Sequence, residues 1–432
     1  MAFDDSFAST AEKPSAAILC AARAREAKDA LAALGATGRS RAIQACAEAI
    51  RRAQDTISAA NEQDMKAAQA AFMALPLQDR LRLGTDRIQA LCASMEEVAA
   101  AADPLDQVVG GRRLPSGVAM EQVTVPLGVV AMIYEARPNV TGDAIALCLR
   151  SGNACVLRSG SAAINTCRAI VEAARQGLEN VQVDPNVIQF VDSTDRQSSV
   201  DLMHATGLVD LLIPRGGASL IRTCVQESTV PTIETGTGNC HIYLERTASV
   251  PMATSIVLNA KCSRPGVCNA AESLLVDREA ATLLLPPVLA ALHEQGVELV
   301  GDARACAAAE ASGIPMEVAT ADDWGTEYLD LKMSVKVVEG VSEAIAHINR
   351  YGTGHSECIV TSDYEASQVF LAQVDAACVY VNASTRFTDG GMFGLGTEIG
   401  ISTQKIGVRG PMGASALTTT KYLLRGAGQV RP

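Results

Sequence analysis

The sequence predicts an α/β protein with two lobes, each built on its own parallel sheet. Short apolar segments alternate with helical patterns from residue 128 to residue 381, which is typical of repeated βαβ units. The chain has 432 residues, more than a single hydrophobic core usually supports. Of these residues 48% are hydrophobic but only 3% aromatic, a composition that suits helices packed closely against a sheet.

The first hundred residues show the 3.6-residue period of helices. We expect helices over 15–34, ending at Gly35, over 39–71, and over 77–102, where Asp103-Pro104 stops the pattern. Residues 114–125 then alternate between polar and apolar side chains, which predicts an antiparallel pair of strands partly outside the main sheet.

From Gly128 onward, strands and helices alternate strictly. The first series has strands at 129–134, 154–157, 187–191 and 209–213, with helices at 141–150, 162–176, 196–204 and 218–226. The second series has strands at 241–244, 273–276, 298–300, 334–338, 357–360 and 377–381, with helices between them. A late strand at 417–424 has no neighbour in sequence, so we expect it to pair with the early hairpin of another subunit.

The charge and cysteine content exclude several classes of protein. A formal net charge of −12 argues against binding to nucleic acid or to an anionic membrane, so local arginines must hold any anionic substrate. The 13 cysteines form no C-x-x-C pair and no zinc spacing with histidine, and we expect reduced thiols in a cytoplasmic protein. Adjacent Cys240 and His241 point to opposite faces of an extended segment, so joint metal ligation is not expected. We also expect no secretory signal and no membrane span.

Cys268 is the strongest candidate for a reactive residue. The turn Arg264-Pro265-Gly266 ends a helix before it and a strand begins at Ser273, so the thiol lies on a tight loop. We expect Arg264 and nearby backbone N–H groups to lower the pKa of this thiol. The alternative is a small buried side chain that only packs.

Three glycine-rich segments invite comparison with phosphate-binding loops. Gly236-Thr-Gly238 and the segment 394–400 both depart from the G-x-G-x-x-G pattern, and a turn is the better interpretation of each. The segment 213–219 follows a strand and opens a helix, so its free N–H groups favour an anion site.

Several longer motifs identify a family. The chain resembles the aldehyde dehydrogenase superfamily over nearly its whole length, and within it the enzymes that reduce an acyl phosphate of glutamate. The motifs carrying this resemblance are 125–139, 213–217, 234–241, 264–269, 351–355, 382–390, 393–396 and 399–405. Two positions depart from the pattern: Gly407 replaces a common histidine and Thr420 a common tyrosine.

The resemblance implies two Rossmann-like three-layer lobes and a small oligomerisation element. The implied cofactor-binding domain spans 1–113 and 128–233, the catalytic domain 234–405, and the oligomerisation element 114–127 and 406–432. This superfamily binds its nicotinamide cofactor without the G-x-G-x-x-G pattern, in agreement with the absence noted above.

The implied reaction converts gamma-glutamyl phosphate and NADPH into glutamate-5-semialdehyde, NADP and phosphate, in proline biosynthesis. Cys268 matches the superfamily nucleophile, whose thioester accepts hydride; Cys262 is its rival but is better explained by packing. Asn139 matches the side-chain donor to the oxyanion, with Arg137 as an alternative occupant and an N-cap as the structural alternative. Glu234 matches the glutamate that activates water, and here it would relay protons or order its loop.

The resemblance also implies how the cofactor and the substrate are bound. Arg158 would bind the 2′-phosphate of NADPH through two N–H donors of its guanidinium group. The alternative is a surface arginine. Glu327 would hold the nicotinamide ribose. The alternative is an acidic side chain that is simply exposed to solvent. The hypothesised residues for the pyrophosphate are Arg215, Gly216, Gly217 and Ser219, and those for the substrate's anionic groups are Arg137, Arg264 and Arg386.

Two other functions stay open at this point. A related aldehyde dehydrogenase would hydrolyse the thioester to a free acid and would not require phosphate. A catalytically dead relative would be expected to lack the nucleophile. We expect a homo-oligomer, dimeric or larger, and a contact with glutamate 5-kinase, which supplies the acyl phosphate, stays an open possibility.

Overall fold

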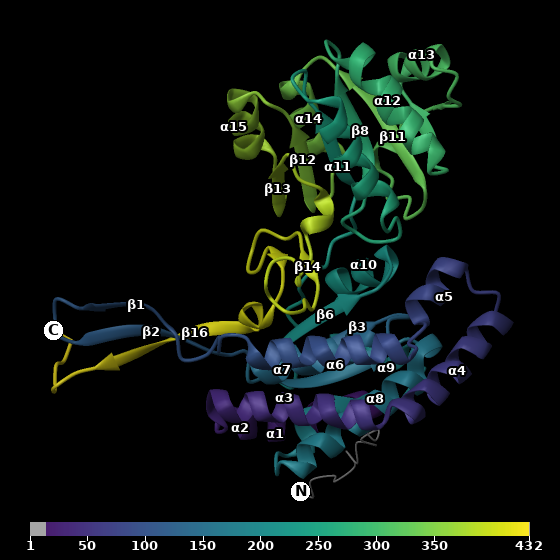
Figure 1. Cartoon of the computed structure of the whole chain (residues 1–432). Helices are drawn as coiled ribbons and strands as arrows, with labels where there is room; N and C mark the ends of the chain where they lie inside the picture. Colours follow the sequence, from purple (N-terminus) through teal and green to yellow (C-terminus); the bar gives the residue numbers. More distant parts are fainter. Residues whose placement is uncertain (1–13, 432) are drawn as a thin grey trace, which may run out of the picture.

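The computed structural model describes residues 14–431, which form two α/β lobes and an extended arm (Figure 1). Each lobe has its own parallel sheet, one of four strands and one of seven, so the predicted fold class is confirmed. No helix within this part of the chain is long and apolar enough to cross a membrane.

From residue 14 onward, six helices precede the first sheet. They are α1 (Ala16–Ala27), α2 (Asp29–Ala32), α3 (Gly35–Arg52), α4 (Gln54–Ala70), α5 (Leu75–Leu81) and α6 (Thr85–Ala100). The single helix expected over 39–71 is wrong, because Ala53 leaves the helical conformation at φ −84° and ψ 10°. Gly35 was expected to end a helix, but it begins α3 with φ +62°. The apolar period continues across both breaks, so it does not reveal them.

The four-stranded sheet of the first lobe has the order β5-β4-β3-β6. Its strands are β3 (Val129–Tyr134), β4 (Ala154–Ser159), β5 (Ile188–Phe190) and β6 (Leu211–Arg215), with helices α7 (Asn139–Arg150), α8 (Ile164–Asn180), α9 (Gln197–Met203) and α10 (Ala218–Glu227). The chain moves from β3 to β4 and β5 on one side, then returns to β6 on the other. The strand order therefore reverses between β3 and β6, where open α/β sheets bind ligands at the carboxyl ends of their strands.

The seven-stranded sheet of the second lobe has the order β10-β9-β11-β8-β7-β12-β13. Its strands are β7 (Cys240–Leu244), β8 (Ala271–Asp277), β9 (Glu298–Gly301), β10 (Glu317–Val318), β11 (Lys332–Val338), β12 (Ser356–Val360) and β13 (Cys378–Val381). The helices are α11 (Val250–Cys262), α12 (Ala281–Glu294), α13 (Ala303–Ala311), α14 (Val341–Tyr351) and α15 (Tyr364–Gln373). The sequence pattern missed α13 and β10, which are short and largely solvent-facing.

A three-stranded antiparallel arm extends away from the lobes (Figure 1). It consists of β1 (Val108–Arg113), β2 (Ala119–Pro126) and β16 (Thr418–Arg425), and β2 lies in the middle. The hairpin begins before the expected residue 114, because β1 is exposed on both faces and shows no alternation. The pairing of β16 with another subunit is also corrected, since β16 pairs with β2 of its own chain from Thr418↔Pro126 to Arg425↔Ala119.

The segment before β16 connects the two lobes. It contains the short strands β14 (Ile401–Ser402) and β15 (Gly410–Pro411), and Ser402 bridges to Thr235 at the start of the second lobe. Ile399, Met412 and Leu417 belong to the hydrophobic core of the first lobe. The chain therefore returns from the second sheet to the first, and this return places residues 390–405 at the junction of the lobes.

Candidate active site

Cys268 lies half-buried in the loop between the end of α11 and the start of β8, as the sequence predicted. The backbone of Gly238 lies directly against this loop, so close that a Cβ atom there would overlap the carbonyl oxygen of Cys268. The Sγ of Cys240 donates to the same carbonyl oxygen at 3.2 Å. The glycines of the segment 236–238 therefore support the cysteine loop, and no helix follows them that would make a phosphate-binding turn.

A buried ion pair closes the loop that carries Cys268. Lys261 in the last turn of α11 and Glu272 in β8 are both fully buried, with Nζ 2.6 Å from Oε2. The other carboxylate oxygen of Glu272 accepts the backbone N–H of Leu329 at 3.2 Å. Burial raises the pKa of Glu272 to about 7, against the opposing effect of Lys261. The two residues join the helix and the strand on either side of the thiol.

The electrostatic environment of the thiol differs from the expectation. Burial raises the pKa of Cys268, while the guanidinium groups of Arg215 and Arg137 act to lower it. The expected net lowering of this pKa is therefore wrong, because removal from water outweighs the nearby cations. Arg215 ends β6 of the first lobe and pairs with Glu398 at 4.0 Å. The thiol of the second lobe thus faces charges that belong to the first.

Arginines from both lobes lie near this thiol. Burial, together with the nearby cations Arg215 and Arg80, lowers the pKa of Arg137 to about 10. Burial and the charge of Arg264 also lower the pKa values of Arg80 and Arg386. The structure thus brings together the three arginines hypothesised for the substrate and adds Arg215 and Arg80 to them. We call Arg80, Arg137, Arg215, Arg264 and Arg386 the arginine cluster.

Two members of the arginine cluster are held against the cysteine loop. Arg80 of α5 donates to the carbonyl oxygen of Gly266. Arg386 lies in a short 3₁₀ turn (Thr385–Phe387) and donates to Asn269 Oδ1 and, at 3.3 Å, to Ser263 Oγ. Arg80 was missed because it lies outside every motif, in a region where the sequence shows only helical periodicity.

Asn139 is the first residue of α7, and its side chain is exposed. The N-cap alternative is wrong, since Pro138 takes that position and Asn139 instead donates its Nδ2 to Asp143 Oδ2 at 3.2 Å. Thr397 donates to the other carboxylate oxygen of Asp143, also at 3.2 Å. Burial, together with the nearby carboxylate of Glu398, raises the pKa of Asp143 to about 7. Asp143 is one helical turn from Asn139, and no sequence motif singled it out.

The two predicted glutamates occupy different environments. The side chain of Glu234 is exposed, and its backbone N–H donates to Gln404 Oε1 at 3.0 Å. Glu327 is half-buried, and its Oε1 accepts the backbone N–H of Gly238 at 2.7 Å. In this structure Glu327 therefore supports the loop beneath Cys268, and its predicted contact with a ribose stays a prediction.

The carboxyl ends of β3 and β6 meet at the start of α10, where the sequence predicted an anion site. Glu135 directly follows β3, and its Oε2 accepts the backbone N–H of Gly217 at 3.0 Å. A Cβ atom on Gly216 would lie 2.5 Å from the same oxygen. A carboxylate of the chain itself thus occupies this helix start, and sequence reasoning missed it. Of the other residues expected here, Ser219 is exposed, and Arg215 pairs with Glu398 and acts on the charge of Cys268.

Arg158 is buried near the carboxyl end of β4. Its Nε donates to Ser198 Oγ at 3.4 Å and its Nη2 to the carbonyl oxygen of Asp195 at 3.1 Å. The alternative of a surface arginine is therefore wrong. Burial lowers its pKa, and the nearby carboxylate of Glu135 opposes that effect.

These residues fit a dinucleotide cofactor in chemistry and in position. The start of α10 lies where the strand order reverses, and it already holds one carboxylate on a backbone N–H. Glycines at 216 and 217 let an anionic group approach the backbone closely. Arg158 supplies a cation on the neighbouring strand β4.

Comparison with known proteins agrees with this arrangement. Residues 6–305 match the model of the aldehyde dehydrogenase family. The chain is 48% identical over 411 residues to the gamma-glutamyl phosphate reductase of Caldicellulosiruptor bescii, covering 95% of this chain and 98% of the relative. It is 50% identical over 410 residues to the same enzyme of Moorella thermoacetica, covering 95% and 97%. The crystal structure of gamma-glutamyl phosphate reductase from Thermotoga maritima superposes with a TM-score of 0.92 at 41% identity, covering 97% of this chain and all (100%) of the other.

Proposed function

The chain belongs to the aldehyde dehydrogenase family and within it to the gamma-glutamyl phosphate reductases, and we propose that it reduces gamma-glutamyl phosphate through a thioester on Cys268. The products are glutamate-5-semialdehyde and phosphate, and the reaction belongs to proline biosynthesis. The observation that carries the proposal is the thiol of Cys268 at the lobe junction, surrounded by the arginine cluster.

The first step is transfer of the glutamyl group to sulfur. The thiolate of Cys268 attacks the acyl carbon, a C–S bond forms, and the C–O bond to phosphate breaks. Burial raises the pKa of the thiol and so disfavours the thiolate, and the charges of Arg215 and Arg137 oppose this effect. The thiolate is thus stabilised mainly by charges from the other lobe, so the thiol is most reactive when the two lobes are in place.

The arginine cluster supplies the cations that an acidic protein needs for an anionic substrate. A gamma-glutamyl phosphate carries a phosphate and an α-carboxylate, and arginine binds both with paired N–H donors. Arg137 and Arg215 come from the first lobe, and Arg264 and Arg386 come from the second. We assign the substrate's anionic groups to this cluster, with Arg80 as a further member that also fixes the loop at Gly266.

Asn139 and Asp143 together provide the donor for the oxyanion in this proposal. The carboxylate of Asp143 accepts one N–H of the Asn139 amide, which fixes the orientation of that amide and leaves its second N–H to donate. Glu234 is not required for hydrolysis in the reductive direction, because water does not resolve the thioester. Its anchored backbone supports the alternative role of ordering the loop.

The cofactor side of the proposal rests on the first lobe, with Glu327 added from the second. Gly216, Gly217 and Ser219 at the start of α10, together with Arg158 on β4, would hold the phosphates of NADPH, and Glu327 would hold the nicotinamide ribose. A bound NADPH would supply the hydride that reduces the thioester. Glu135 must release the N–H of Gly217 before a phosphate takes the same donor, because one N–H cannot serve both anions.

The assembly and the location are also part of this proposal. The arm exposes apolar side chains such as Val108, Tyr422 and Leu424, which supports a homo-oligomer built through β1, β2 and β16. All thirteen cysteines are free thiols, which supports a cytoplasmic location. No feature described above bears on a contact with glutamate 5-kinase.

The decisive experiment follows the reaction in the oxidative direction. Wild-type protein is mixed with glutamate-5-semialdehyde, inorganic phosphate and NADP, and NADPH formation is recorded by absorbance. We expect turnover that requires phosphate, and a loss of at least about a thousandfold in Cys268→Ser, because a serine hydroxyl is a far weaker nucleophile.

Cys262→Ser is the matched control, since this thiol ends α11 and packs against the core of the second lobe. Full activity without phosphate would point to the hydrolytic aldehyde dehydrogenase instead. Wild-type turnover in Cys268→Ser would remove the thioester mechanism altogether.

A further inference from the structure

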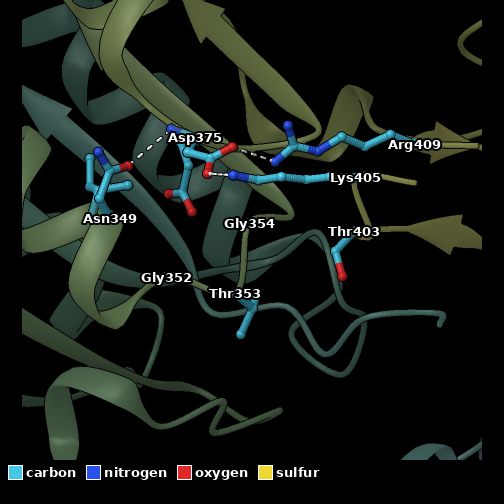
Figure 2. A pocket seen from close by; sticks show the side chains of 10 residues that line it. Asn349, Gly352, Thr353, Gly354, Asp375, Thr403, Lys405 and Arg409 are labelled. Atoms are coloured by element: carbon cyan, nitrogen blue, oxygen red, sulfur yellow. Dashed lines mark hydrogen bonds and ion pairs between the residues drawn. The ribbon is translucent and has the colours of Figure 1, made fainter. Parts of the chain in front are cut away.

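A polar cavity lies apart from Cys268 and the arginine cluster. It has a volume of about 330 Å³ and is lined by the loop 352–354 after α14, by Asp375, and by the segment 403–409 (Figure 2). None of the residues assigned above to the substrate or the cofactor lines it. The proposed reaction therefore leaves this cavity unused.

One end of the cavity has an excess of positive charge. Arg409 Nη2 is 2.8 Å from Asp375 Oδ1, and Lys405 Nζ pairs with the other oxygen of the same carboxylate (Figure 2). Asn349 Oδ1 accepts the backbone N–H of Asp375 at 2.9 Å and so fixes its position. Two cations thus share one carboxylate. The Nε of Arg409 is buried and has no hydrogen-bond partner within residues 14–431.

The other end of the cavity presents an unsatisfied acceptor. Glu357 in β12 is fully buried and lines the cavity. Its Oε2 accepts the backbone N–H and the Nδ1 of His241, at 2.6 and 3.0 Å. Its Oε1 is also buried, and no donor among the described residues reaches it. Buried polar atoms normally have a partner, so an acceptor without one inside a cavity points to a ligand with a donor.

The loop Gly352-Thr353-Gly354 sets the spacing between the two ends. A Cβ atom on Gly352 would lie 2.9 Å from Glu357 Oε1, and one on Gly354 would lie 3.8 Å from Arg409 Nη2. The Cα atoms of Gly352 and Gly354 are at most about 7 Å apart. The two ends of the cavity are therefore close enough for one small molecule to reach both. The missing side chains at both glycines keep the floor of the cavity open.

We propose that this cavity binds a small α-amino acid, with its carboxylate on Arg409 and Lys405 and its ammonium group on Glu357 Oε1. A simple anion would satisfy the cations but leave the acceptor of Glu357 unpaired. A simple cation would satisfy Glu357 but not the buried donor of Arg409. A zwitterion with N–H donors satisfies both ends at once.

The cavity also adjoins the loop that supports the nucleophile. Thr403 lines the cavity, and its side chain lies so close to Gly236 that a Cβ there would overlap it. Gly238, two residues further on, lies against Cys268. An amino acid in the cavity would thus be one contact away from the loop beneath the thiol, although its binding does not depend on the reaction.

The test is isothermal titration calorimetry of the full chain with glycine, L-alanine, L-proline and L-glutamate. Acetate, methylammonium and glycine betaine serve as probes that lack, respectively, the ammonium group, the carboxylate and the N–H donors. We expect saturable binding of at least one amino acid and at least tenfold weaker binding of all three partial probes. Acetate or betaine binding as tightly as the amino acid, or no binding of any amino acid, would overturn the proposal.

Variants separate this cavity from the active site. Arg409→Gln and Glu357→Gln should each weaken binding of the amino acid at least tenfold, whereas Arg386→Gln in the arginine cluster should leave it unchanged. The reverse pattern would place the amino acid at Cys268 and refute the site. Thermal unfolding checks that each variant is folded, and Arg409→Gln alone decides the question if Glu357→Gln proves unstable.

Discussion

The thiol of Cys268 shows how one residue combines opposing environments. Burial raises its pKa, and Arg215 is the strongest of the groups that lower it. Because Arg215 is on β6 and Cys268 is on the loop before β8, the reactivity of the thiol depends on a charge from the other lobe. The sequence motif alone suggested Arg264, which is closer along the chain but not the main influence.

Replacing Arg215 with methionine should therefore make Cys268 less reactive. Loss of the cation raises the pKa of the thiol further, so less thiolate is present at any pH near neutrality and the alkylation profile moves to higher pH. We expect iodoacetamide to modify Cys268 about tenfold more slowly at pH 8, a change of about one pKa unit. Mass spectrometry of the Cys268 peptide measures this, with Arg222→Met on exposed α10 as the control. An unchanged alkylation profile would contradict the assigned role.

Glu135 is the residue where the structure adds most to the cofactor site. Its carboxylate accepts a hydrogen bond from the backbone N–H of Gly217, the donor that the sequence analysis predicted to bind a phosphate. Glu135→Gln should bind NADPH more tightly, because a neutral amide competes less well for this donor and does not repel phosphate. We expect Kd to fall about threefold to tenfold, equivalent to roughly 0.7–1.4 kcal/mol. Titration of NADPH fluorescence measures it without turnover. Weaker binding in the variant would mean that Glu135 is itself a cofactor ligand.

At the scale of elements, the loop that carries Cys268 is supported from two directions. The buried pair Lys261 and Glu272 joins α11 to β8, and the backbone of Gly238 lies beneath the loop. Gly238 is required here because of close approach, since no side chain fits between its Cα and the carbonyl oxygen of Cys268. Glu327 also holds Gly238 in place, by accepting its backbone N–H.

Gly238→Ala should therefore damage the active site. The added methyl group must push the cysteine loop away, at a cost on the order of 1–3 kcal/mol in stability, and we expect turnover to fall more than tenfold. Gly325→Ala is the matched control, because a Cβ there meets no atom within 4 Å. Turnover and thermal midpoints are compared for both variants. Equal behaviour of the two would show that the loop tolerates the displacement.

The two departures from the family pattern also have local explanations. Gly407 adopts φ +88°, a left-handed conformation that glycine adopts without strain. Thr420 on β16 accepts a hydrogen bond from Gln122 on β2 at 2.9 Å. Both substitutions are therefore accommodated within the C-terminal segment and the arm, away from Cys268.

At the scale of the whole molecule, the arm is the part that one chain does not cover. Every residue of β1 is exposed, and Tyr422 and Leu424 of β16 are exposed on the same face because they are two residues apart. Exposed apolar side chains on a projecting sheet indicate a protein interface.

Tyr422→Lys together with Leu424→Lys should consequently reduce the size of the assembly. Burying two ammonium groups in an interface is unfavourable, so we expect the molar mass from light scattering to fall to that of a smaller species at micromolar concentration. Thr419→Lys on the opposite face of β16 is the control. An unchanged molar mass in the double variant would exclude this face of the arm from the interface.

The sequence by itself determined the fold class, the order of the strands along both lobes apart from β10, and the position of Cys268 on a loop. These features follow from local periodicity and from contiguous motifs, such as the break at Arg264-Pro-Gly266 before Cys268. Hydrophobic periodicity did not predict the helix break at Ala53, because the apolar period continues across it. It also did not predict β1, because this exposed strand shows no alternation.

Only the tertiary structure decided which side chains share an environment. It brought Arg80 and Arg215 to the thiol, placed Glu135 on the start of α10, and paired the C-terminal strand with β2 of its own chain. These residues are separated by tens to hundreds of positions, and no local pattern encodes their contacts. Burial and charge act through space, so the electrostatics of Cys268 became visible only once both lobes were folded around it.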